Sequence, residues 1–166
     1  MTTQAHRRTP AIAVSAAARR DQATVRPLRP GDADAVSRLA GACSDECLRE
    51  RFFGRIADPA SMLVAQMREA VWEGGAVGAF VDGQMVAMAV GIPDAADSTW
   101  DLGVLVRDDW QGRRLGERVV RRLLVEAQRA GVVPVALVLA ANRRAVHLVH
   151  RVKQTAAGAG LRVETC

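Results

Sequence analysis

The chain has 166 residues, of which 49% are hydrophobic and 25% charged, with a formal net charge of +5 at pH 7. This composition is typical of one soluble globular domain that is large enough to bury a core. It disfavours a membrane protein, because no stretch approaches the roughly 18 apolar residues that span a bilayer. It also disfavours a disulfide framework, because there are only three cysteines. We therefore expect a cytoplasmic protein with no membrane partner.

The positive charge alone is weak evidence for a nucleic-acid partner. Arginine supplies nearly all of the basic residues, Lys153 is the only lysine, and there is no tyrosine to stack on bases. An arginine excess beside abundant Ala and Val is typical of a genome-wide codon preference. We expect no nucleic-acid partner. The alternative is a basic helix face that binds nucleic acid, made of Arg113, Arg114, Arg118, Arg121 and Arg122.

Residues 1–23 are rich in Ala, Thr and Arg without a clear amphipathic period, which predicts a flexible tail. The apolar part, 11–18, is short and made of small residues, so it makes a poor secretory signal. An export or organelle signal is the alternative for this segment. Further along, Cys43 and Cys47 lie four apart without a second pair of ligands, so we expect ordinary helix residues and no metal site.

The first half of the folded part is predicted to be mainly helical. A short strand after Thr24 and a turn at Pro30-Gly31 precede a helix over 33–42, with Asp32 as its cap. The next two helices are expected in SDECLRERFFG, capped by Ser44 or Asp45, and in DPASMLVAQMREAV, with its proline in the first turn.

The second half alternates between strands and helices. AVGAFVDGQMVAMAVGIP predicts two strands joined by a tight turn at Asp82-Gly83, and STWDLGVLV predicts a third, buried strand. A long helix over 115–130 ends at Gly131. VPVALVLA is a further buried strand, a helix begins at Asn142, and LRVETC closes the chain as a short strand. This order predicts an α/β domain with a mixed sheet and helices on both faces.

The stretch WQGRRLGERVVRRLL, residues 110–124, places glycines and arginines between a buried strand and a helix. Backbone N–H groups at a helix start are unpaired and lie at the positive end of the helix dipole. Glycines let this backbone approach an anion, and arginines add donors. The pattern predicts a phosphate site, although neither common glycine-rich nucleotide motif is present. The alternative is a plain turn beside a solvated basic face.

Here the sequence resembles a known family. VLVRDDWQGRRLGERVVRRLL resembles the acyl-CoA-binding motif of the GNAT superfamily of N-acyltransferases, Gln/Arg-x-x-Gly-x-Gly/Ala at a helix start, with the match from Gln111 to Gly116. AFVDGQMVAMAVG resembles the family's central hairpin. LVLAANRRAVHLVHR resembles its later strand and Asn-x-x-Ala-x-x-Leu helix, and VRPLRPGDADAVSRL its opening strand and helix. The resemblance covers about residues 24–152 and implies one GNAT-like domain over 24–166, with a splayed acyl-CoA cleft in its sheet.

The resemblance implies acetyl-CoA as the cosubstrate, in a cleft between strands 101–106 and 133–139. Its pantetheine arm would pair with the strand backbone and its pyrophosphate would bind the amides of the turn. The positions assigned to the cofactor in this way are Leu105, Val106, Gln111, Gly112, Arg113, Arg114, Leu115, Gly116 and Asn142. For Asn142, a plain helix cap is an equally good interpretation, and the two roles are compatible.

The resemblance also suggests catalytic residues. Asp101 matches a glutamate that many members carry early on the same strand, and desolvation would raise its pKa, as a general base requires. The alternative is that Asp101 only ends a strand. Val149 stands where the family often has an acidic tyrosine, so the neighbouring His147 and His150 are considered, with His150 as the candidate. The alternative for either histidine is a surface position on a basic helix.

Three departures from the family pattern bear on activity. Arg114 replaces a motif glycine, so its side chain either crowds the pyrophosphate or contacts it. The missing tyrosine leaves no standard acid. Residues 153–160 are small where the family has a Gly-aromatic pair and a further strand. Either a second subunit, in a homodimer, completes the acceptor side, or the chain is naturally short there.

SDECLRERFFGRI, residues 44–56, is similar to a segment of bacterial protein-lysine acetyltransferases, although Phe52 and Phe53 also suit a core helix. We therefore expect an N-acyltransferase that moves an acetyl group from acetyl-CoA to a primary amine, with a protein lysine as the favoured acceptor. The alternative is a catalytically weak acyl-CoA-binding regulatory module.

Overall fold

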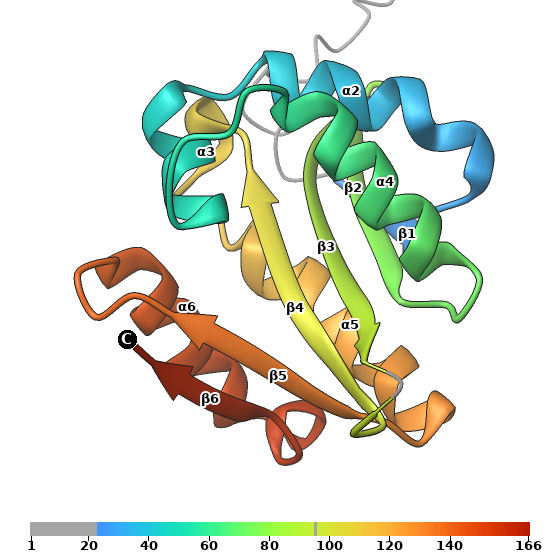
Figure 1. Cartoon of the computed structure of the whole chain (residues 1–166), viewed down its shortest axis with the longest axis vertical. Coiled ribbons are helices and arrows are strands. Elements are labelled where there is room, and N and C mark those ends of the chain that lie inside the picture. The colour runs from blue at the N-terminus through green and yellow to red at the C-terminus, as the bar shows by residue number, and fades with distance from the viewer. Residues whose placement is uncertain (1–22, 95) are drawn as a thin grey trace, which may run out of the picture.

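The computed structural model describes residues 23–94 and 96–166 (Figure 1). The strands are β1 (Thr24–Pro27), β2 (Ala76–Val81), β3 (Gln84–Asp94), β4 (Thr99–Val106), β5 (Val133–Val138) and β6 (Arg162–Thr165). The helices are α2 (Ala33–Gly41), α3 (Asp45–Phe52), α4 (Pro59–Val71), α5 (Leu115–Ala130) and α6 (Arg143–Lys153). The elements follow the order predicted from the sequence. The predicted tail lies outside the described residues except for Ala23, which is buried.

All six strands belong to one mixed sheet, in the order β1-β2-β3-β4-β5-β6. The first four strands are antiparallel, whereas β4 and β5 are parallel, as are β5 and β6. Strands β4 and β5 pair only at Thr99–Asp101 with Val133–Val135. Beyond these pairs the two strands diverge, so residues 102–106 of β4 have no strand partner on that side (Figure 1). The predicted splayed sheet is therefore confirmed.

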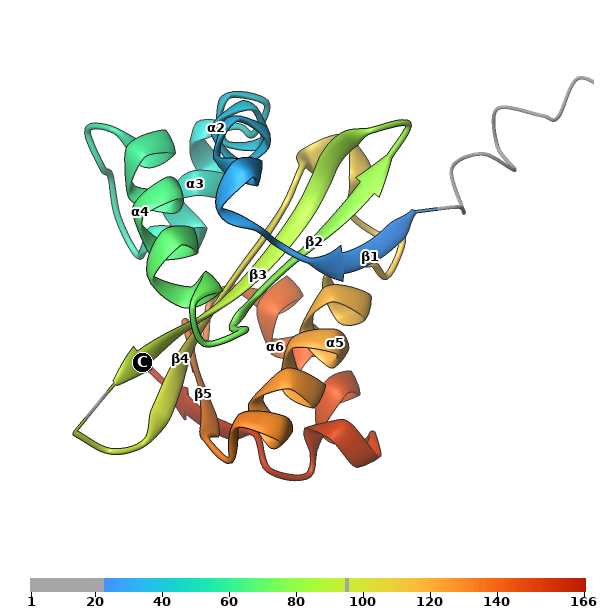
Figure 2. The ribbon, with the colours of Figure 1, turned by 90° about the vertical axis from the view of Figure 1, so that its right-hand side faces the viewer.

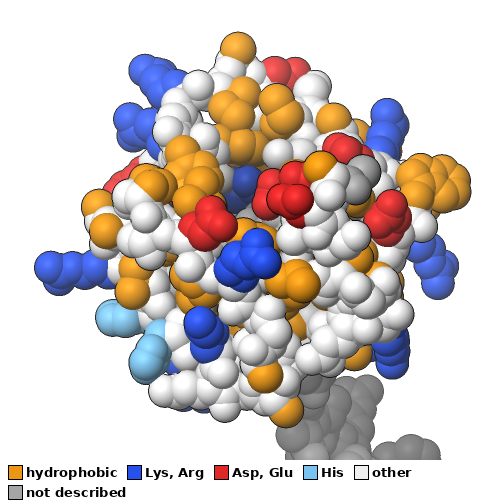
Figure 3. Space-filling view, turned by 60° about the horizontal axis from the view of Figure 1, so that its bottom comes forward, with side chains coloured by type: hydrophobic (Ala, Val, Ile, Leu, Met, Phe, Trp, Pro, Cys, Tyr) orange, Lys and Arg blue, Asp and Glu red, His pale blue; other side chains and the backbone are white. Residues whose placement is uncertain are grey.

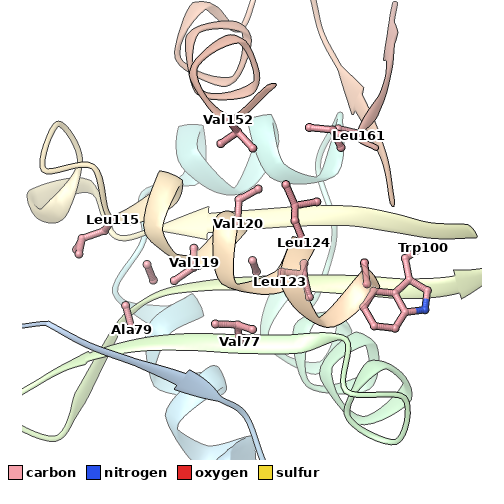
Figure 4. Packing of buried hydrophobic residues seen from close by; sticks show 14 of the residues in the cluster. Val77, Ala79, Trp100, Leu115, Val119, Val120, Leu123, Leu124, Val152 and Leu161 are labelled. Carbon is pink, nitrogen blue, oxygen red and sulfur yellow. The ribbon is translucent and has the colours of Figure 1, made fainter. Parts of the chain in front are cut away.

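The helices cover both faces of this sheet, as the sequence pattern predicted. Figure 2 shows α2, α3 and α4 on one face and α5 and α6 on the other. Helix α5 turns a stripe at helical spacing toward the sheet, namely Leu115, Val119, Val120, Leu123 and Leu124. These side chains pack on residues of β2, β3 and β4, with Trp100 fully buried at one end of the cluster (Figure 4). A second core lies under α2 and α4.

Local signals that the sequence carried are confirmed at most helix starts. Ser44 Oγ accepts a hydrogen bond from Cys47 N at 3.2 Å and caps α3. Asn142 Oδ1 accepts one from Ala145 N at 3.0 Å and caps α6. Asp32 is the exception, because its carboxylate binds Arg26 and does not cap α2. In the described part of the chain, no helix is both long and apolar enough to cross a membrane.

Candidate active site

A pocket of about 480 Å³ opens where β4 and β5 diverge. Its walls come from α3, β4, the turn before α5 and the start of that helix, β5, and α6 along most of its length. Ligand sites in proteins typically have volumes of roughly 300–1,000 Å³, so this pocket is large enough for a small molecule. Seen from the lower side of Figure 1, acidic and basic side chains stand close together among hydrophobic ones, around a hollow (Figure 3).

One end of the pocket is formed by the turn from Gln111 to Gly116. Gly112 and Arg114 have positive φ, and α5 begins directly afterwards at Leu115. Within the described residues, none of the amide N–H groups from 112 to 116 donates to a protein acceptor; the first helical bond runs from Arg118 N to the Arg114 carbonyl. A row of free amides at the positive end of a helix dipole suits a diphosphate. The turn therefore fits the coenzyme A pyrophosphate.

The Gln111 side chain ties this turn to both strand and helix. Its Nε2 donates to the Val106 carbonyl at 3.1 Å, and its Oε1 accepts from Arg144 Nη1 at 2.8 Å. The Cys47 thiol also donates to the Val106 carbonyl, at 3.5 Å. The carbonyl of Val106, at the end of the free β4 edge, therefore already has hydrogen-bond donors. A ligand that pairs with this edge meets unpaired backbone only before Val106 in the strand.

The predicted cofactor residues nearly all line the pocket: Leu105, Val106, Gln111, Gly112, Arg114, Leu115, Gly116 and Asn142. Arg113 does not. Its guanidinium carbon lies 4.6 Å from the centre of the Trp110 ring, in a cation–π contact, and its side chain is exposed. Of the two adjacent arginines of the turn, the structure brings Arg114 to the pocket and places Arg113 outside it.

Neither predicted catalytic residue, Asp101 or His150, lines the pocket. Asp101 is exposed and lies opposite Val135, in the part of β4 that still pairs with β5. The strands diverge only beyond this pair, so Asp101 stops short of the opening. His150 is exposed on α6, with its Nε2 3.0 Å from Gln154 Nε2. His147, one turn earlier, lines the pocket in its place.

Helix α3 supplies three pocket residues that the sequence analysis missed: Cys47, Glu50 and Arg51. They are spaced i, i+3 and i+4 and so share one helix face; this spacing is visible in SDECLRERFFG and could have been used. A hydrogen bond with the Cys43 thiol lowers the pKa of Cys47 and raises that of Cys43. Burial lowers the pKa of Arg51 to about 10.

Two carboxylates line the pocket, and their surroundings differ. Glu117 is buried at the start of α5 and forms ion pairs with Arg121 at 2.5 Å and with Arg151 at 3.2 Å. Glu50 is half-buried and has no ion pair within the part of the chain that the structure describes. Glu50 is therefore the pocket carboxylate that is free to meet a cationic ligand.

A thiol pair lies at the edge of the pocket, where Cys47 lines the wall and Cys43 does not. The Sγ atoms of Cys43 and Cys47 and a carboxylate oxygen of Asp108 are within 4.8 Å of one another. The Asp108 carboxylate already accepts hydrogen bonds from Ser44 N at 2.8 Å and Ser44 Oγ at 2.7 Å. Three ligand atoms fall short of the four that structural zinc sites use.

Comparison with known proteins bears on this pocket. Residues 43–152 match the family model described as the acetyltransferase (GNAT) family, which is more than half of the chain. No protein of curated function matches the sequence.

Several solved structures share the fold. The GNAT domain of S. lividans PAT has a TM-score of 0.67 and 22% identity, covering 78% of this chain and 80% of that one. The yncA protein from Salmonella typhimurium, solved with its cofactor acetyl-CoA, has a TM-score of 0.61 and 21% identity, covering 78% of each chain. The ribosomal-protein-S18-alanine N-acetyltransferase from Escherichia coli has a TM-score of 0.59 and 18% identity, covering 78% and 76%.

The family match spans α3, the diverging strands, the amide-rich turn and α6, which are the elements that build the pocket. The free amides and the unpaired β4 edge fit acetyl-CoA as the cosubstrate of this family. The chain therefore belongs to the acetyltransferase (GNAT) family and is an acetyl-CoA-dependent N-acetyltransferase.

Proposed function

We propose that this protein acetylates the side-chain amine of a protein lysine by direct attack of the amine on the thioester of acetyl-CoA. The observation that carries the reaction type is the pocket, which joins a diphosphate-binding turn to a free carboxylate on α3. Support for a protein acceptor comes from the similar Escherichia coli enzyme, which is a ribosomal-protein-S18-alanine N-acetyltransferase.

The turn and the β4 edge are proposed to hold the cosubstrate. The amides from Gly112 to Gly116 bind the pyrophosphate, Arg114 adds a guanidinium at the same place, and Asn142 lies at the opposite wall. When bound, acetyl-CoA supplies an activated acyl group with a good leaving thiolate. Binding both reactants in one pocket replaces a bimolecular encounter by an oriented one, which is a large part of the rate gain in such transfers.

Glu50 is proposed to prepare the acceptor. Its carboxylate attracts the ammonium group and takes a proton from it, directly or through a water, so that the amine can attack. Glu117 cannot serve in this way without losing two ion pairs, one within α5 to Arg121 and one to Arg151 of α6. With no tyrosine in the chain, the thiolate leaves without a tyrosine acid; His147 is the histidine of the pocket wall.

The test compares Glu50→Gln with Glu46→Gln, an exposed glutamate on the same helix that does not line the pocket. With acetyl-CoA and lysine peptides, we expect Glu50→Gln to lower kcat/KM by about a hundredfold and Glu46→Gln to leave it unchanged. Thermal shift with acetyl-CoA should be retained in both variants. Equal turnover of Glu50→Gln and wild type would remove Glu50 from the mechanism.

A second candidate, an acyl-CoA-binding module with weak catalysis, is favoured by Arg114 in the turn and by the positions of Asp101 and His150 outside the pocket. Stabilisation by acetyl-CoA without turnover of any amine would support this second candidate. If neither acetyl-CoA nor propionyl-CoA raised the melting temperature, both candidates would fail.

A further inference from the structure

Arg51 stands out among the charged residues of the pocket because it is recessed and lacks a counter-ion. It lies in the wall that α3 contributes, and protein atoms surround its guanidinium closely enough to lower its pKa by desolvation. No carboxylate of the described residues lies within ion-pair distance of it. A desolvated charge without a counter-ion is costly, so this arginine is unlike the exposed arginines of α5.

The guanidinium of Arg51 is held in place by neutral contacts only. Nη2 donates to Gln66 Oε1 on α4 at 2.7 Å, and the guanidinium carbon lies 4.9 Å from the centre of the Phe52 ring. The other N–H donors have no protein acceptor among the described residues. These unpaired nitrogens of Arg51 are also not fully buried. Among the described residues, the one side-chain nitrogen or oxygen that is both buried and without a hydrogen-bond partner is Trp100 Nε1. These donors therefore remain available to a ligand in the pocket.

Gly103 of β4 makes this position possible. A Cβ atom built on Gly103 would overlap the Nη2 and Cζ atoms of Arg51, so the guanidinium lies directly against the strand backbone. Gly103 and Arg51 both line the pocket. Gly103 lies three residues before Val106, toward the point where β4 and β5 join, whereas the turn proposed for the pyrophosphate follows Val106 at the other end. Arg51 is thus placed away from the cofactor phosphates.

We propose that Arg51 binds a carboxylate of the acceptor, so that the preferred acceptors are primary amines with a carboxylate close to the amine. This inference rests on the proposed transfer to an amine and names the acceptor more closely. A guanidinium binds a carboxylate through two parallel N–H···O bonds, which position it as well as attract it. Glu50, the next residue on the same pocket wall, then receives the ammonium group, so the pair matches an acceptor that carries both charges.

Two sources of such a carboxylate are separated by matched acceptors. Alanine against alaninamide tests a free amino acid, and a lysine peptide with Asp against Asn beside the lysine tests a protein segment. For at least one pair we expect wild type to prefer the acid by about tenfold to a hundredfold in kcat/KM, the range for a hydrogen bond to a charged group. Arg51→Gln should lose that preference. Arg49→Gln, an exposed arginine on the same helix outside the pocket, should retain it.

Gly103→Ala provides an independent variant, because it keeps the arginine but displaces its guanidinium from the strand. We expect it to lose the acid preference as Arg51→Gln does, while the thermal shift with acetyl-CoA shows that the variant is folded. The proposal would be overturned if wild type showed no preference for the acid in either pair. It would also be overturned if the preference survived in Gly103→Ala, or if Arg49→Gln removed it as well. A preference for succinyl-CoA over acetyl-CoA that depends on Arg51 would show that Arg51 binds a carboxylate of the acyl group and not of the acceptor. This result would overturn the proposal as well.

The failure of the proposed function is distinguishable from the failure of this inference. If wild type turned over no amine, the proposed reaction would be disproved. Binding of a carboxylate at Arg51 would then be measured without turnover. Thermal shift in the presence of coenzyme A, with N-acetylalanine against N-acetylalaninamide, then decides it. Stronger stabilisation by the acid, lost in Arg51→Gln, supports the site; equal stabilisation refutes it.

Discussion

Gly112 and Arg114, two residues apart in the turn before α5, both adopt the left-handed backbone conformation, with φ of 75° and 58°. Glycine adopts this conformation at little cost, whereas the Cβ of arginine crowds the backbone there. The sequence resemblance predicted a glycine at position 114. The backbone now supplies the physical reason for that preference, and it shows that arginine keeps the turn at a cost.

This cost can be measured by replacing Arg114 with glycine. We expect Arg114→Gly to raise the free energy of unfolding by about 1 kcal/mol, because the strain disappears. Arg114→Ala is the matched control, since it removes the guanidinium and keeps a Cβ at positive φ. Urea unfolding at pH 7 provides the values. Equal stability of the glycine and alanine variants would show that the backbone at Arg114 is unstrained.

The ion pairs of Glu117 are expected to stabilise the packing of α5 against α6. Its carboxylate is buried, whereas Arg151 and Arg121 are partly exposed, so we expect Glu117→Gln to cost about 2 kcal/mol of unfolding free energy. A double-mutant cycle with Arg151→Met isolates the contact between the helices, and a second cycle with Arg121→Met isolates the contact within α5. A coupling energy near zero for Arg151 would show that this pair does not hold α6.

The pair between Arg26 of β1 and Asp32 predicts a dependence of stability on pH. Two hydrogen bonds of 2.8 Å from the guanidinium lower the pKa of Asp32. Because the folded pKa is below the unfolded value of about 3.9, the stabilisation is present above that pH and is lost as the pH falls through the folded pKa.

We therefore expect Asp32→Asn to cost about 1 kcal/mol at pH 7 and progressively less as the pH falls below about 4. Asp34→Asn, at an exposed aspartate without an ion pair among the described residues, is the control. Chemical unfolding at a series of pH values tests this. A cost for Asp32→Asn that stayed constant down to pH 2.5, well below the usual pKa of aspartate, would contradict the assignment.

Two variants of Asn142 distinguish its role as a helix cap from its proposed role in binding the cofactor. Its side chain caps α6 through Ala145 N and also lines the pocket. We expect Asn142→Ala to cost about 1 kcal/mol of unfolding free energy, whereas Asn142→Asp, which preserves the cap, should cost much less. Titration with acetyl-CoA then shows whether Asn142→Asp binds more weakly. Full affinity in both variants would leave Asn142 with the cap alone.

The order of the elements could be predicted from the sequence because its signals are local. Hydrophobic spacing marked α5 from Leu115 to Ala130, the Asp82-Gly83 turn marked the β2–β3 hairpin, and Ser44 and Asn142 marked helix starts. The turn proposed for the cofactor was predicted in the same way, since the strand, the glycines and the helix start that build it are contiguous in the chain.

The charged wall of the pocket depends on contacts between distant segments, which local signals in the sequence do not report. Asp101 was chosen by its place along β4, but the strand pairing with Val135 continues up to that residue and the pocket opens only beyond it. Likewise, the sequence does not show that Arg51 comes to lie on Gly103, because that contact exists only once α3 packs over β4. The sequence by itself determined the fold and the diphosphate turn, through short-range periodicity and capping. Only the tertiary structure decided which charges line the pocket, because this depends on where two strands separate and which helix covers the gap.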